Sequence, residues 1–93
     1  MKIFFNNQRH IVCTPYTREN LHAMAKLLGI KRCWFHAHPY PHYDMPKSWV
    51  KPMDFGLTLD SHLFNVDVYN ACEGTDITYE EVSPQDILRI VKS

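Results

Sequence analysis

The pattern of apolar and polar positions divides the first third of the chain into short elements of both kinds. Apolar and aromatic residues bounded by polar turns predict strands at 2–5 and 9–13. Apolar residues at helical spacing then predict a helix over 18–28. Thr17 is placed to cap its first turn, and Gly29 stands where a left-handed residue ends a helix.

The remaining pattern predicts three more elements and one long loop. Residues 30–35 favour a strand returning along the helix, which gives a β-α-β start. Four prolines within 37–54 predict a long irregular loop rich in proline and histidine. Alternation over 62–69 and a second extended run over 76–82 predict a β-hairpin, and Ser83-Pro84 opens a closing helix that runs through Val91.

These elements predict one small mixed α/β (α+β) domain spanning residues 1–93. No apolar run reaches the roughly 18 residues that cross a bilayer, and the first residues lack a signal-peptide pattern, so we expect no membrane association. Three widely spaced cysteines, an odd number, favour free thiols and a cytoplasmic location.

Charge is distributed unevenly along a chain whose formal net charge is zero. Residues 1–55 carry eight Lys or Arg against three Asp or Glu, and residues 56–93 carry two against seven. The first half is therefore suited to face an anion, unless folding mixes the two halves on one surface. A dedicated nucleic-acid binder has a clearly basic balance, and we do not expect nucleic acid as a partner.

The densest group of reactive side chains lies between residues 33 and 44, with three of the six histidines and one carboxylate within nine residues. Imidazole and carboxylate are ordinary ligands of Zn, Fe or Mn. A divalent metal site would use His36, His38, His42 and Asp44. The spacing matches no metal motif, and the plain alternative is a loop stiffened by prolines, with His36 beside a strand and His38 in water.

A third interpretation of the same loop is a surface for a ligand. Histidine donates and accepts hydrogen bonds, and Tyr40 and Tyr43 offer flat faces for stacking a base. With Lys31, Arg32 and Lys47 nearby, a phosphate-bearing ligand fits better than an apolar one.

Residues 21–25, 28–30 and 32–35, together with His42-Tyr43-Asp44, resemble the core pattern of the domain of unknown function 4031 family. The resemblance implies a small protein of the kind found in bacteria and their phages, and it covers mainly residues 1–44. Residues 45–55 diverge from the pattern, and their role is not predicted. The polar positions that it marks are His10, His22, Arg32, Trp34, His42, Tyr43 and Asp44.

Asn6 and Asn7 stand where the family's first strand ends in paired aspartates. Amides hold a divalent ion poorly, so this departure favours binding over turnover, unless the two asparagines simply form a turn. No catalytic residue and no cofactor are assigned on this interpretation. The expected ligand-binding residues are Asn6, His10, His22, Arg32, His36, His38, Tyr40, His42, Tyr43, Asp44 and Lys47.

Three functions from different classes remain open at this point. The first is a phage-type protein that captures a phosphate-bearing small molecule, a nucleotide immune signal by analogy, in the host cytosol. The second is a metal-dependent phosphodiesterase or nuclease that uses the divalent ion described above. The third is an inhibitor of a host protein that binds through exposed Trp49, Tyr40 and Tyr43. Pairing into a homodimer also stays open.

Overall fold

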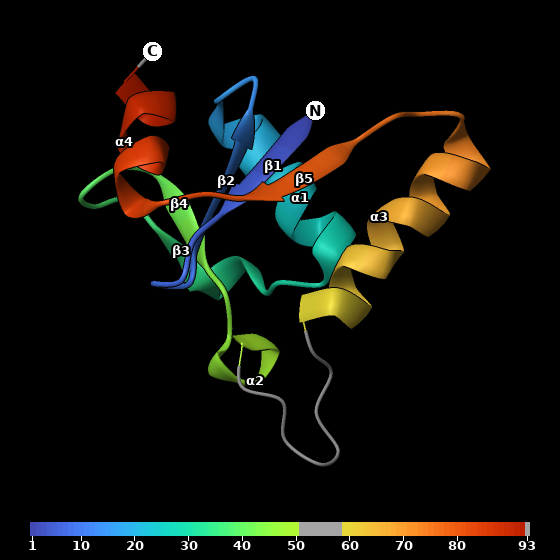
Figure 1. Ribbon diagram of the computed structural model, residues 1–93, viewed down its shortest axis with the longest axis horizontal. Helices are drawn as coiled ribbons and strands as arrows, with labels where there is room; N and C mark the ends of the chain where they lie inside the picture. Colours follow the sequence, from blue (N-terminus) through green and yellow to red (C-terminus); the bar gives the residue numbers. More distant parts are fainter. Residues whose placement is uncertain (51–58, 93) are drawn as a thin grey trace.

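The computed structural model describes residues 1–50 and 59–92, which form a five-stranded sheet with helices on both sides (Figure 1). The strand order is β3-β4-β2-β1-β5. The strands are β1 (Lys2–Phe5), β2 (His10–Thr14), β3 (Phe35–His36), β4 (His42–Asp44) and β5 (Thr78–Glu81). The helices are α1 (Arg18–Leu28), the 3-10 turn η1 (Arg32–Trp34), α2 (Lys47–Val50), α3 (Leu59–Glu73) and α4 (Pro84–Lys92). The predicted α+β class is confirmed.

Strands β1 and β2 form an antiparallel hairpin, as the two extended runs predict. The side chain of Asn6 organises its turn, because Oδ1 accepts hydrogen bonds from the backbone N–H groups of Gln8 (2.9 Å) and His10 (3.1 Å). Arg9 completes the turn with a left-handed φ of 67°. The turn therefore fixes where β2 begins, and with it the position of His10.

Helix α1 has the predicted bounds and the predicted ends. Thr17 Oγ1 accepts a hydrogen bond from the backbone N–H of Asn20 at 3.1 Å. Gly29 has φ 80°, and the next N–H, of Ile30, donates to the carbonyl of Ala25 at 2.8 Å. The apolar face of the helix packs against β2 and β4. Its buried residues are Leu21, Met24, Ala25 and Leu28.

The predicted strand over 30–35 is wrong for residues 30–34, but the predicted β-α-β order holds, because β2 and β3 flank α1 along the chain and belong to one sheet. After Gly29 the chain turns through η1, where the N–H of Trp34 donates to the carbonyl of Lys31, and only Phe35 and His36 are extended. The β propensity of these aromatic residues is overridden by the turn that brings the chain back from the helix end. The order of the first elements is therefore β1, β2, α1, η1 and β3, with β3 reduced to two residues. The predicted long loop over 37–54 contains β4 and α2, and its part from residue 51 lies outside the described residues.

The predicted strand over 62–69 is also wrong, because these residues belong to helix α3. Its buried residues, His62, Leu63 and Val66, have helical spacing, whereas the apparent alternation came from Phe64 and Val68 on the exposed side. No hairpin therefore joins this segment to β5. Strand β5 instead pairs with β1 in parallel.

The closing helix α4 is confirmed, with Ser83 Oγ accepting from the N–H of Asp86 at 3.2 Å. Ile87 is its buried residue. In Figure 1, α4 and α3 lie on opposite sides of the sheet. Among the described helices, none combines the length and apolar character needed to cross a membrane.

Candidate functional site

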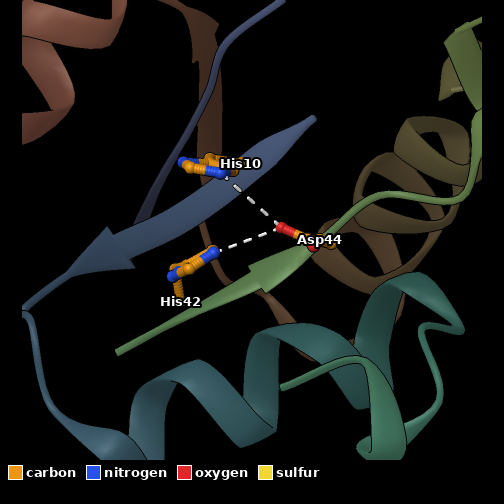
Figure 2. A group of neighbouring side chains, drawn as sticks. All are labelled: His10, His42 and Asp44. Atoms are coloured by element: carbon orange, nitrogen blue, oxygen red, sulfur yellow. Dashed lines mark hydrogen bonds and ion pairs between the residues drawn. The ribbon is translucent and has the colours of Figure 1, made fainter. Parts of the chain in front are cut away.

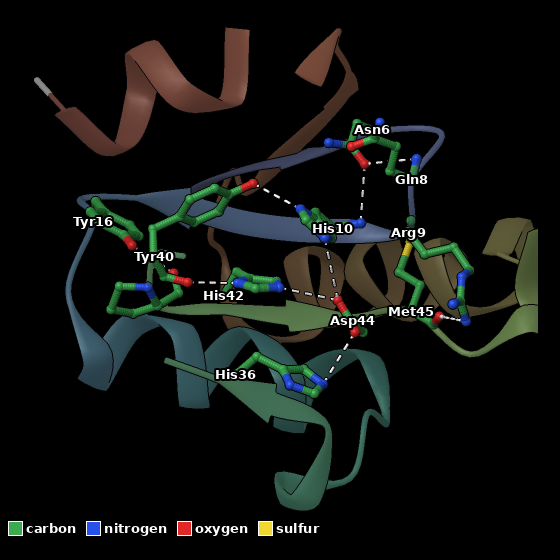
Figure 3. A network of polar contacts seen from close by, with 11 residues as sticks. Asn6, Gln8, Arg9, His10, Tyr16, His36, Tyr40, His42, Asp44 and Met45 are labelled. Carbon is green, nitrogen blue, oxygen red and sulfur yellow. Dashed lines mark hydrogen bonds and ion pairs between the residues drawn. The ribbon is translucent and has the colours of Figure 1, made fainter. Parts of the chain in front are cut away.

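Strand pairing gathers four titratable side chains on one face of the sheet. His10 of β2 lies opposite Asp44 of β4, and His36 of β3 lies opposite His42 of β4. Side chains of directly paired residues share a face, and so do those of residues two apart on one strand. Figure 3 shows the three imidazoles directed toward the carboxylate from three neighbouring strands.

Asp44 is the centre of this cluster. Its Oδ1 lies 3.1 Å from Nε2 of His42 and 3.8 Å from Nε2 of His10. Figure 2 marks both contacts with dashed lines. Oδ2 of Asp44 lies 3.1 Å from Nε2 of His36. Three imidazoles thus surround one carboxylate, and we call these four residues the His-Asp cluster.

The hydrogen bond on the far side of His42 fixes which of its nitrogens carries a proton. Nδ1 lies 2.6 Å from the backbone carbonyl of Tyr40, which can only accept, so Nδ1–H is the donor. In neutral His42 the lone pair of Nε2 then faces the carboxylate oxygen of Asp44. Two acceptors 3.1 Å apart require a proton or a metal ion between them.

Tyr40 also contacts His10, whose Nδ1 lies 2.8 Å from the phenolic oxygen. The pKa of His10 is lowered, first by burial and then by the positive charge of His42, against the opposing effect of Asp44. Burial and the charge of Asp44 raise the pKa of Tyr40. At neutral pH, His10 is therefore neutral with an available lone pair, and the Tyr40 hydroxyl keeps its proton.

The segment that contains Tyr40 and leads into β4 is held by a hydrogen bond from a residue just after β2. The hydroxyl of Tyr16, which follows β2, donates to the carbonyl of Pro41 at 2.6 Å. This bond holds the chain at the start of β4 against the end of β2. The spacing between His10, Tyr40 and His42 is therefore set by the fold rather than by a free loop.

The cluster fits a metal ion. One ligand atom each from His10, His42 and Asp44 lie within 4.8 Å of one another. Three ligands about 2.1 Å from a tetrahedral ion lie roughly 3.4 Å apart, so small side-chain movements suffice. His36 contacts Oδ2, the other carboxylate oxygen of Asp44. It therefore resembles the residues around metal sites that do not bind the ion themselves but orient a carboxylate that does.

The cluster is more exposed at His36 than at His42. The side chain of His42 is 3% exposed, that of Asp44 is 24% exposed, and that of His36 is 50% exposed. An ion held here would have protein behind it at His42 and water in front of it near His36. This is the arrangement that leaves a coordination position for a water molecule.

A second group of the predicted residues lies on the opposite face of the sheet. Tyr43, between His42 and Asp44, pairs with Ile11 and Phe35 on the α1 side. Its hydroxyl lies 2.6 Å from Nδ1 of His22 on α1. His22, Tyr43 and Arg32 line a pocket of about 420 Å³, to which α1 also contributes Lys26. The sheet itself separates this pocket from the His-Asp cluster.

Comparison with known families gives a match over residues 7–56, more than half of the 93-residue chain. The chain belongs to the family described as protein of unknown function (DUF4031). Neither a curated protein nor a solved structure matches the chain. The DUF4031 segment begins at residue 7, after β1, and it includes residues 45–56, beyond the 1–44 that the resemblance covered.

The DUF4031 segment contains the whole His-Asp cluster and the residues of the second pocket named above. It does not contain His62, β5 or α4. Both groups of polar side chains are therefore features of the family segment of this chain, whereas the later elements complete the fold around it.

The other predicted residues contribute no side chain to either group. Asn6 is buried in its turn with Oδ1 paired to the backbone, while its Nδ2 has no hydrogen-bond partner among the described residues. His38 and Lys47 are exposed, and the group whose ligand atoms approach one another contains His10 rather than His38. The sequence marked His10 only loosely, because nothing local encodes the pairing of β2 with β4.

Trp49, expected as an exposed anchor for a protein partner, is buried. Its side chain is 6% exposed, and its ring stacks on His62 of α3 at 3.6 Å between centroids. The expectation of an exposed Trp49 is therefore wrong, because the indole joins α2 to α3. Sequence reasoning also missed Lys26, although the spacing of four residues from His22 placed both on one side of a helix.

Proposed function

We propose that this protein binds one divalent transition-metal ion through His10, His42 and Asp44 and uses it to hydrolyse a phosphate ester. The observation that carries the proposal is the approach of His42 Nε2 to Asp44 Oδ1 at 3.1 Å while His42 Nδ1 is committed to a carbonyl. This is the carbonyl-histidine-metal arrangement of many metal sites.

The donor set favours a metal of the zinc class. Two imidazole nitrogens with one carboxylate suit Zn, Fe or Mn, whereas Mg and Ca prefer oxygen ligands. None of the three cysteines belongs to the group of ligand atoms found among the described residues. Zinc with three protein ligands keeps a fourth position for water, which supports hydrolysis rather than a purely structural site.

The charge beside the cluster supports an anionic substrate. Arg9, which precedes His10, donates to the carbonyl of Met45, which follows Asp44, at 3.4 Å (Figure 3). Its guanidinium thus lies at the end of β4, beside the residue that follows Asp44. A phosphate ester bound to the ion would also be attracted by this positive charge.

The reaction follows from the ion and the residues around it. A divalent ion held by His10, His42 and Asp44 would lower the pKa of a bound water, so that the water oxygen could attack phosphorus while the bond from phosphorus to the ester oxygen breaks. The proton released by the water ends on the departing alcohol. His36 is the exposed group of the cluster that can carry this proton, and Asp44 Oδ2, at 3.1 Å from its Nε2, holds its ring.

Metal content and metal titration test the first half of the proposal. We expect one zinc-class ion per chain by elemental analysis after reconstitution, and d–d absorption bands of a four- or five-coordinate site when Co²⁺ is added to the metal-free protein. His42→Ala and Asp44→Asn should abolish both. His38→Ala, which alters an exposed histidine of the same loop, should leave both unchanged.

Turnover of bis(p-nitrophenyl) phosphate by the metal-loaded protein tests the second half. We expect release of p-nitrophenol that is lost with chelator and in Asp44→Asn and is retained in His38→Ala. A bound ion without turnover would reject hydrolysis of this ester class and keep the metal site. Absence of ion binding in the folded wild-type protein would reject both halves.

A further inference from the structure

The pocket on the α1 side of the sheet has the composition of an anion site. Its volume of about 420 Å³ lies in the usual range of small-molecule sites. Three of its lining residues, His22, Lys26 and Arg32, bear basic groups, and none of its lining residues is acidic. The rest of the lining is small or apolar, apart from the hydroxyl of Tyr43.

The basic groups of this pocket are not neutralised within the described part of the chain. None of the ion pairs found there includes Lys26 or Arg32. The charges of Arg32 and Arg18 both reach His22, where they add to burial in lowering its pKa. The pocket therefore has a positive potential that an anion would relieve.

The hydrogen bond between Tyr43 and His22 prepares the histidine as a donor. Burial raises the pKa of Tyr43, so its hydroxyl keeps its proton and can donate to Nδ1 of His22, which lies 2.6 Å away. In the tautomer that accepts this bond, neutral His22 carries its proton on Nε2, for which the described residues provide no hydrogen-bond partner. The ring is further fixed against Phe35, with 5.1 Å between centroids.

We propose that this pocket binds a small phosphate monoester, independently of the metal site on the other face. Arg32 and Lys26 contact the phosphoryl oxygens, His22 Nε2 donates to a third, and the apolar wall of Ala23 and Ile30 accepts the body of the ester. Helix α1 positions two of these donors, because His22 and Lys26 lie one turn apart. The proposal does not rest on the proposed hydrolysis.

Calorimetric titration of the full chain with adenosine 5′-monophosphate, in excess EDTA, tests this site. Chelation keeps the phosphoryl group from being captured by an ion in the His-Asp cluster. We expect saturable binding of one nucleotide per chain, with adenosine, which has the same body without the charge, bound at least tenfold more weakly. Arg32→Gln and Lys26→Gln should each weaken binding about tenfold.

Two variants make the result specific. Lys31→Gln removes an exposed positive charge next to Arg32 that does not line the pocket, and it should bind as the wild type does. His42→Ala alters the opposite face and should also bind as the wild type does. Lys26, Lys31 and Arg32 are exposed, so circular dichroism should show their three variants folded, and the same measurement on His42→Ala establishes that this control is folded before it is used.

Three outcomes would overturn the proposal. Equal affinity for the nucleotide and for adenosine would show that the phosphoryl group is not recognised. Loss of binding in His42→Ala with retention in Arg32→Gln would move the phosphate to the other face. Absence of measurable binding at millimolar nucleotide would reject a phosphate monoester as the ligand of this pocket.

Discussion

His42 and Asp44 place Nε2 and Oδ1 3.1 Å apart on one face of β4, while the hydroxyl of Tyr43 between them is hydrogen-bonded to His22 on the other face. Three consecutive residues thus serve two chemically different environments. The period of two in a strand is sufficient to achieve this, without any irregularity of the backbone. Separate predictions can be made for the two environments and for the fold that holds them.

Metal binding should stabilise the folded protein. An ion that binds only the folded chain adds about 2.7 kcal/mol when its free concentration is 100 times the dissociation constant. Urea unfolding with and without Zn²⁺ should show this gain for the wild type and for His38→Ala. The same gain in Asp44→Asn would place the ion elsewhere than at the His-Asp cluster.

Asn6→Ala should destabilise the protein by about 1–3 kcal/mol, because the backbone donors of Gln8 and His10 lose their shared acceptor. Asn7→Ala is the matched control, since Asn7 is exposed beside the same turn. Urea unfolding of both variants measures the difference. Similar stability of the two variants would show that the Asn6 bonds do not hold the turn.

The three cysteines should divide into two reactive thiols and one unreactive thiol. Cys33 and Cys72 are exposed, whereas burial raises the pKa of Cys13 to about 11. At pH 8 about one Cys13 in a thousand is a thiolate, and that thiolate is also covered. Titration with a thiol reagent should count two groups in the native protein and three in urea. Three fast groups in the native protein would contradict the burial of Cys13.

Stability of the metal-free protein should fall as the pH drops below 6.5. The pKa of His22 is lowered in the fold, first by burial and then by Arg32 and Arg18, so the unfolded chain takes up the proton at a higher pH than the folded chain. The contribution is present above 6.5 and is lost as the pH falls through the folded pKa. Urea midpoints at pH 7.5 and 5.5 measure this loss, which should be smaller in His22→Gln. If His22→Gln lost as much stability between pH 7.5 and 5.5 as the wild type, the pH dependence would come from other groups.

Trp49→Ala should cost about 3–5 kcal/mol, because it removes a buried indole that stacks on His62. Trp49→Phe keeps an aromatic ring on the histidine and should cost clearly less. Thermal unfolding of the two variants gives the comparison. If Trp49→Ala were as stable as the wild type, the stack would not be what holds α2 on α3.

Sequence alone predicted the elements that are stabilised by local signals. Helix α1 has its cap at Thr17 and its left-handed end at Gly29, and α4 has its cap at Ser83, so each carries its own start or stop. Helix α3 was not predicted, because Phe64 and Val68 on its exposed side are apolar and gave the segment the alternation of a strand. Its buried positions are recognisable only once the packing against α1 is known.

The candidate site could be predicted only as far as its residues are close together in the sequence. His36, Tyr40, His42 and Asp44 stand out because they are close together along the chain. His10 joins them through the register of β2 on β4, which depends on a hairpin turn and on the return of the chain after η1. No local pattern encodes this pairing. Lys26, by contrast, lies four residues after His22 on the same side of α1, so a local pattern for it was present in the sequence.

The position of β1 outside the family segment has a practical consequence. Strand β1 lies between β2 and β5, but the matched residues begin at 7. A peptide cut to residues 7–56 would keep every side chain of both sites and leave one whole side of β2 unpaired. Such an exposed strand edge, rich in the apolar residues Ile11, Val12 and Cys13, is a template for aggregation. The smallest piece of the chain that stays monodisperse in water is therefore larger than the piece by which its family is recognised.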